Sequence, residues 1–137
     1  MPNPVFLDSS GLIAAIRRND SLHRKARRVL ESFADEGVHL ITSEWVLCEF
    51  LAGAARRPMR AVAIDVVDQL RSSNVAEIVS SGPRAFAAAL DLYRRRTDKE
   101  WSLVDCSSIL ICQDRGIRQV FTHDHHFRQA GFETLLV

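Results

Sequence analysis

Short apolar segments alternate with longer amphipathic segments along this chain, and this alternation is the feature that most constrains its fold. The short segments predict strands at residues 5–7, 38–41, 75–79, 119–121 and 134–137. In the longer segments apolar residues recur every three or four positions, which predicts helices at residues 12–17, 21–36, 43–56, 60–71, 83–96, 102–115 and 126–129. Strands that alternate with helices indicate an α/β protein with a parallel sheet, right-handed crossovers and helices on both faces.

The size and composition of the chain limit the classes of protein to which it can belong. Its 137 residues, 47% of them hydrophobic, suffice for one domain (residues 1–137) with a buried core. Its three cysteines have no CxxC spacing, which argues against both a disulfide framework and a zinc site. The N-terminus lacks the pattern of a signal peptide, and no apolar run reaches the roughly 18 residues of a membrane span. We therefore expect a soluble cytoplasmic protein that does not associate with membranes.

Two aspartates directly follow expected strands. Asp8 comes after residues 5–7, and Asp124 comes shortly after residues 119–121. In open α/β sheets ligands bind beyond the carboxyl ends of the strands, so both side chains are expected where a site would form. The alternative for either residue is an aspartate that only stabilises a turn.

Two further acidic residues lie on expected helices. Glu49 is in an apolar helix, where a buried and unpaired carboxylate would cost several kcal/mol unless a cation, a hydrogen-bond donor or solvent compensates it. The alternative is a solvated Glu49 or one paired with Arg56 or Arg57. Asp105 follows Ser102 with the spacing of a capping box, so an ordinary helix cap is the alternative there.

Taken together, these four acids indicate a metal site. Carboxylates at close range cannot all ionise without a compensating charge, and no lysine or arginine accompanies the four motifs at a fixed spacing. Hard oxygen ligands without adjacent histidine or cysteine favour Mg²⁺ or Mn²⁺ over zinc.

The motifs that contain these acids also resemble a known family. FLDSSGLIA, SEWVLCEFLAGA, WSLVDCSSIL and VFTHDHHFRQAGFETL, in this order, are similar to the motifs of PIN-domain nucleases, and most closely to VapC-like toxins of bacterial toxin–antitoxin pairs. The resemblance extends from end to end of the chain. It implies a single PIN-like (Rossmannoid) domain with about five parallel strands in the order 3-2-1-4-5, flanked by helices, and a Mg²⁺-dependent ribonuclease site in which Mn²⁺ is also possible.

The resemblance also implies which residues form the site. The catalytic, metal-binding quartet would be Asp8, Glu49, Asp105 and Asp124. Ser9 matches the hydroxyl residue that follows the first aspartate, and Thr122 matches the one two positions before the last. Asp98 competes with Asp105 for the third position, and we favour Asp105 because it lies at the start of the apolar helix.

The chemistry implied by such a site is hydrolysis of an RNA phosphodiester bond by water that the metal activates, without a side-chain nucleophile. His123, His125 and His126 surround the last aspartate. They could serve as acids or bases or bind adventitious nickel or zinc, or they could simply be polar residues of an exposed turn.

The charge distribution is compatible with RNA. Without the four proposed ligands, 13 acidic residues face 18 basic ones, so the rest of the chain carries about +5. The strongest candidates for phosphate contacts are Arg17, Arg18, Arg56, Arg57 and Arg95. A wider set is Arg24, Lys25, Arg27, Arg28, Arg60, Arg94 and Arg96. The alternative for each of them is a solvated helix face.

Other functions remain possible on the sequence alone. They are a PIN ribonuclease of RNA maturation without an antitoxin, an inactive PIN module that binds RNA or protein, and a phosphohydrolase with Asp8 as nucleophile. The last is disfavoured because Ser10 stands where such enzymes often carry a second aspartate. For a VapC-like toxin, the resemblance further implies a homodimer and a cognate antitoxin whose C-terminal segment covers the acidic cleft. Neither the target RNA nor the number of metal ions follows from the sequence.

Overall fold

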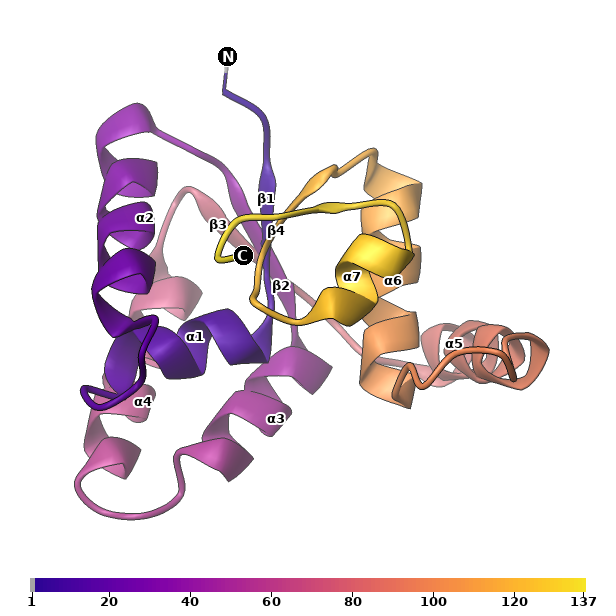
Figure 1. Cartoon of the computed structure of the whole chain (residues 1–137), viewed down its shortest axis with the longest axis horizontal. Coiled ribbons are helices and arrows are strands. Elements are labelled where there is room, and N and C mark those ends of the chain that lie inside the picture. The colour runs from indigo at the N-terminus through magenta and orange to yellow at the C-terminus, as the bar shows by residue number, and fades with distance from the viewer. Residues whose placement is uncertain (1) are drawn as a thin grey trace.

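A five-stranded sheet organises the computed structural model, which describes residues 2–137 (Figure 1). Its strands are β1 (Val5–Leu7), β2 (Leu40–Ser43), β3 (Ala76–Val79), β4 (Gln119–Phe121) and β5 (Glu133–Thr134). All four pairings are parallel, and the spatial order is β3-β2-β1-β4-β5. The predicted fold class and strand order are therefore confirmed. Because β1 is central, its carboxyl end lies between those of β2 and β4.

The helices lie on both sides of this sheet. They are α1 (Ser9–Ile16), α2 (His23–Glu36), α3 (Glu44–Gly53), α4 (Met59–Ser72), α5 (Pro83–Arg95), α6 (Leu103–Arg115) and α7 (His125–Gln129). In Figure 1, α1, α2 and α4 lie to the left of the strands, α3 lies below them, and α5 to α7 lie to the right. Within residues 2–137, no helix combines the length and the apolar character that crossing a bilayer requires.

Large aromatic side chains fill the core between the sheet and its helices. Phe6, Phe50, Phe121 and Phe127 are fully buried. Phe33 of α2 packs edge-on against Phe121 of β4, with ring centroids 5.8 Å apart. These rings fix α2, α3 and α7 against the strands whose ends carry the acidic residues, since burial of each aromatic side chain contributes roughly 2–3 kcal/mol.

The bounds of two elements, the second strand and the first helix, differ from the sequence-based prediction for reasons visible in the structure. The second strand begins at Leu40 rather than at residue 38, because its partner β1 begins at Val5, which pairs with Leu40. It then continues to Ser43, which pairs with Val79 of β3. The first helix begins at Ser9, three residues earlier than predicted, because the preceding aspartate caps it directly.

The final strand also differs from the prediction. The predicted strand covers residues 134–137, but β5 comprises only Glu133 and Thr134, which pair with Gln119 and Val120 of β4. The short length of β4, three residues, leaves few ladder positions for its partner.

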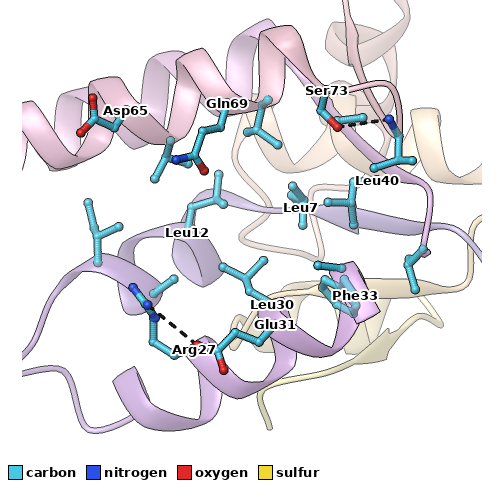
Figure 2. A pocket seen from close by; sticks show the side chains of 18 of the residues that line it. Leu7, Leu12, Arg27, Leu30, Glu31, Phe33, Leu40, Asp65, Gln69 and Ser73 are labelled. Carbon is cyan, nitrogen blue, oxygen red and sulfur yellow. Dashed lines mark hydrogen bonds and ion pairs between the residues drawn. The ribbon is translucent and has the colours of Figure 1, made fainter. Parts of the chain in front are cut away.

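A groove lies on one face of the sheet between α2 and α4 (Figure 2). Its volume is about 630 Å³. Leu7, Leu12 and Leu40 lie among its apolar lining. An ion pair between Arg27 and Glu31 (3.8 Å) lies on the α2 side, so the groove is apolar inside and charged at this margin.

Candidate metal centre

Asp8 lies at the carboxyl end of the central strand, and its side chain is only 3% exposed. It is the N-cap of α1. One of its oxygens, Oδ2, accepts hydrogen bonds from the hydroxyls of Thr122 (2.8 Å) and Ser10 (3.0 Å). The same two hydroxyls are 2.8 Å apart, so β4 and α1 together fix the orientation of this carboxylate.

The surroundings of Asp8 disfavour its charged form. The pKa of this carboxyl is raised from 3.8 to about 6, chiefly by burial and also by the nearby charges of Asp105 and Glu49, against the lowering effect of the two hydroxyl hydrogen bonds. A buried carboxylate that two other carboxylates repel is an unfavourable arrangement in the absence of a cation. A divalent cation bound near these three carboxylates would offset the repulsion between them.

Glu49 joins this group from α3. The hydroxyl of Ser9 donates a hydrogen bond of 2.5 Å to its Oε1, which connects α3 to the first turn of α1. The side chain is exposed, and among residues 2–137 it makes no ion pair with Arg56 or Arg57. Within residues 2–137, the only hydrogen bond to the Glu49 carboxylate comes from the residue next to Asp8, which places Glu49 near the carboxyl end of β1.

Asp105 has two contacts through a single oxygen. Its Oδ2 accepts from the backbone N–H of Ser102 (3.0 Å), and its own N–H donates to the Ser102 hydroxyl (3.0 Å), which completes a capping box. The cap that the sequence suggested as an alternative is thus present. The same Oδ2 also lies 2.9 Å from Nδ1 of His126. The cap and the acidic cluster are therefore compatible, because the cap occupies only one oxygen.

Asp124 follows β4 and caps α7. Its Oδ1 accepts from the backbone N–H of His126 (2.9 Å) and lies 3.2 Å from Nδ1 of the same histidine. Its own N–H donates to the hydroxyl of Thr122 (3.0 Å), which in turn bonds to Asp8. One hydrogen-bond network therefore connects the last aspartate to the first.

The four carboxylates share a pattern that bears on metal binding. In each of them, all hydrogen bonds from residues 2–137 go to one oxygen and leave the other without a protein donor. The oxygens without a donor are Asp8 Oδ1, Glu49 Oε2, Asp105 Oδ1 and Asp124 Oδ2. Such hard oxygen donors, held rigidly by their neighbours, fit Mg²⁺ or Mn²⁺.

The structure keeps Asp98 away from this group. Both of its oxygens form hydrogen bonds of 3.0 Å with Arg96, and this contact lowers the pKa of the Asp98 carboxyl to about 2. Arg96 also stacks on the ring of Trp101, with 4.9 Å between the guanidinium carbon and the ring centroid. Asp98 is therefore part of an exposed ion pair, and the preference for Asp105 at the third position stays a prediction.

Sequence analysis did not identify two residues that hold the acidic group together. Ser10 bonds to Asp8, and its only sequence signal is a hydroxyl two positions after a capping aspartate. His126 contacts Asp105 across 21 residues, which no local spacing predicts. His123 and His125 are exposed. Nδ1 of His125 lies 3.8 Å from Oδ1 of Asp124.

The candidate phosphate-binding arginines differ in their surroundings. Arg17 and Arg18 follow α1, and Arg56 and Arg57 lie between α3 and α4, and all four are exposed. Arg95 instead forms an ion pair of 3.0 Å with an aspartate one helical turn before it. The first four are thus better placed than Arg95 to contact an anionic ligand.

Comparison with known proteins identifies the family. The family model of the PIN domain matches residues 5–133. The 23S rRNA-specific endonuclease VapC20 of Mycobacterium tuberculosis is 27% identical over 128 residues, which cover 93% of this chain and 95% of that protein. The crystal structure of Mycobacterium tuberculosis VapC20, a sarcin-ricin loop cleaving toxin, has a TM-score of 0.82 at 26% identity, with the same coverage.

A second solved structure is similar in fold alone. It is FitAcB from Neisseria gonorrhoeae, with a TM-score of 0.65 and 17% identity, and the match covers 95% of each chain. The similarity to VapC-like nucleases that the motifs predicted is thus confirmed over nearly the whole chain. The chain belongs to the PIN-domain family.

Proposed function

We propose that this protein is a Mg²⁺-dependent endoribonuclease and the toxin of a toxin–antitoxin pair, with Mn²⁺ able to replace Mg²⁺. The metal ligands would be Asp8, Glu49, Asp105 and Asp124. The observation that carries the proposal is that the charges of Asp105 and Glu49 act on a buried Asp8 whose pKa is raised, and that Asp124 is linked to Asp8 through Thr122. Each of these four carboxylates has one oxygen without a donor among residues 2–137.

The residues of the chain have distinct roles in this proposal. Bound Mg²⁺ would supply positive charge to the scissile phosphate and make a water molecule more acidic. Thr122 and Ser10 hold one oxygen of Asp8, so the orientation of the whole carboxylate is fixed. Ser9 does the same for Glu49. Water would be the nucleophile that cleaves the phosphodiester bond, so no lysine, cysteine or serine side chain is required for that role.

The substrate class follows from charge and from the relatives. Arg17, Arg18, Arg56 and Arg57 are exposed and available to contact phosphates. The relative VapC20 is named for action on 23S rRNA, and its structure is described as that of a sarcin-ricin loop cleaving toxin. We therefore propose ribosomal RNA as the substrate, and hence the cytoplasm as the place of action.

The proposal predicts that cleavage depends on a divalent metal. Purified protein incubated with ribosomes and with total RNA is expected to cut at a few discrete sites in Mg²⁺ or Mn²⁺, to stop in EDTA, and to recover when Mg²⁺ is added back. Primer extension would map the cuts. An Asp98→Asn variant serves as the matched control and should cleave normally, since Asp98 is paired with Arg96 outside the acidic group.

Two results would contradict the proposal. Cleavage that persists in EDTA would exclude a metal-dependent nuclease. Absence of cleavage by folded protein that binds Mn²⁺ would favour an inactive RNA-binding or protein-binding module.

The antitoxin is the second part of the proposal, and the groove between α2 and α4 supports it. The apolar lining of the groove is open to solvent in the isolated chain, and a partner helix would bury it. Val62, at 45% exposure, lies on its α4 side.

We also propose a homodimer, because Phe86 and Tyr93 of α5 are 47% and 51% exposed and such aromatic side chains favour interfaces.

A small reading frame next to the gene tests the toxin proposal against a ribonuclease of RNA maturation. Its product is expected to copurify with this protein and to inhibit cleavage, and a Val62→Asp variant should weaken that complex at least tenfold while cleaving RNA normally. Light scattering on the free protein would measure the dimer. An isolated gene, or a neighbouring protein that does not bind, would favour the maturation enzyme.

A further inference from the structure

His126 connects two acidic residues that come from different elements. Its ring Nδ1 lies 2.9 Å from Oδ2 of Asp105, at the start of α6, and 3.2 Å from Oδ1 of Asp124, at the start of α7. The side chain is 19% exposed, and that of Asp105 is 9% exposed. The imidazole is thus largely buried between the two aspartates, unlike His123 and His125, which are exposed.

The identity of the partners determines the direction of these hydrogen bonds. An ionised carboxylate has no proton, so it can only accept. Nδ1 of His126 must therefore carry the hydrogen and donate it to both aspartates. The backbone N–H of His126 also donates to Oδ1 of Asp124, so one residue holds this oxygen with two of its N–H groups.

This arrangement selects which oxygens remain available. Because His126 takes Oδ2 of Asp105 and Oδ1 of Asp124, the other oxygen of each carboxylate is directed away from it. The capping N–H of Ser102 reinforces the same choice at Asp105. A residue that fixes the orientation of metal ligands in this way contributes to metal affinity without contacting the metal.

We propose that His126 is a positioning residue that aligns Asp105 and Asp124 for metal binding, through an Nδ1–H that it keeps when the metal is bound. The inference rests on the proposed metal site. It assigns His126 neither to the metal itself nor to proton transfer with RNA. Removal of such supporting hydrogen bonds typically weakens metal binding by roughly 10–100-fold.

Metal affinity in three variants tests the proposal without reference to RNA cleavage. Mn²⁺ binding would be measured by titration calorimetry and by electron paramagnetic resonance. His126→Ala is expected to bind Mn²⁺ at least tenfold more weakly than the natural protein. His126→Asn should stay within about threefold, because the amide Nδ2–H of asparagine can take the place of Nδ1–H. His123→Ala is the matched control and should bind normally.

Circular dichroism would establish that each variant is folded. Rescue by asparagine separates positioning from direct ligation, because an amide nitrogen is a poor metal ligand. Equal affinity of His126→Ala and the natural protein would overturn the inference. Equally weak binding by the alanine and asparagine variants would overturn it too, since it would indicate that the imidazole nitrogen itself is a ligand.

A second measurement shows directly which ring nitrogen of His126 carries the hydrogen. Long-range ¹H–¹⁵N correlation spectra of the histidine rings report which nitrogen carries hydrogen. Nδ1 of His126 is expected to be protonated in both the metal-free and the Mg²⁺-loaded protein, and loss of that hydrogen on loading would overturn the proposal.

If the natural protein binds neither Mn²⁺ nor Mg²⁺, the proposed metal site is wrong, and this inference is wrong with it. If metal binding and the His126 effects are present but RNA is not cut, only the nuclease proposal fails.

Discussion

An Asp8→Asn variant is expected to lose metal-dependent RNA cleavage by about 10³-fold or more while becoming more stable than the natural protein in EDTA. The loss follows from the position of Asp8 in the acidic group, where the charges of Asp105 and Glu49 act on its carboxylate. Asparagine keeps the shape and the acceptor oxygen for Thr122 but removes the charge that attracts the metal. Several kcal/mol of transition-state stabilisation supplied by a bound metal corresponds to this factor.

The gain in stability follows from the pKa of Asp8. In the folded protein this pKa is about 6, whereas the value without burial is 3.8, so the folded state binds the proton more tightly. The resulting stabilisation is complete below about pH 4 and is lost as the pH rises through 6. At pH 7 without metal, the ionised carboxylate therefore costs about 3 kcal/mol relative to a neutral group. Asparagine is neutral at every pH and avoids this cost.

Thermal unfolding and cleavage assays on the same preparations test both parts. In EDTA the variant should unfold at a higher temperature than the natural protein at pH 7, and the gap should narrow toward pH 4. Saturating Mg²⁺ should stabilise the natural protein and not the variant. Asp98→Asn, a matched change outside the cluster, should cleave normally. An Asp8→Asn protein that cleaves RNA normally would remove Asp8 from the site.

The second large effect is expected from Gly11→Ala. Helix propensity alone predicts that alanine within α1 is more stable than glycine by about 1 kcal/mol. The tertiary structure predicts the opposite, because a Cβ on Gly11 would lie 2.3 Å from the carbonyl oxygen of Phe121 and 2.6 Å from its ring. The same carbonyl accepts a hydrogen bond from the N–H of Asp8. Helix α1 and β4 would have to move apart beside Asp8, to which Ser10 and Thr122 bond.

We expect Gly11→Ala to lower the free energy of unfolding by about 3 kcal/mol, or the melting temperature by roughly 10 °C. RNA cleavage should fall as well, because Thr122 and Ser10 would no longer hold the Asp8 carboxylate in one orientation. Calorimetry and chemical denaturation would measure the change. Gly82→Ala is the control, because a Cβ there meets no atom within 4 Å, and its effect should be within about 0.5 kcal/mol. A Gly11→Ala protein as stable as the natural one would show that the close approach is absent.

Much of the fold could be predicted from the sequence. The alternation of apolar segments and helical patterns predicted every strand and helix that the structure contains, although several boundaries shifted by two or three residues. Local chemistry also indicated a particular cap, the capping box at Ser102 and Asp105. These features depend on residues within one or two turns of each other.

The acidic residues show where local prediction ends. The positions of Asp8 and Asp124 after strands indicated a site, but the same patterns also fitted simple turns and caps. The strand order, which places β4 beside β1, brings Thr122 to Asp8 across 114 residues. The contact of Ser9 with Glu49 spans 40 residues.

The sequence by itself thus determined which segments form strands and helices, because backbone propensity and the periodicity of apolar residues act over a few residues. Only the tertiary structure decided that Asp105 both caps α6 and brings its charge near Asp8, that Asp98 pairs with Arg96, and that His126 contacts two acids. Those outcomes depend on hydrogen bonds and charges between elements. Packing around the sheet sets the distances between the elements, and no periodic pattern in the sequence indicates those distances.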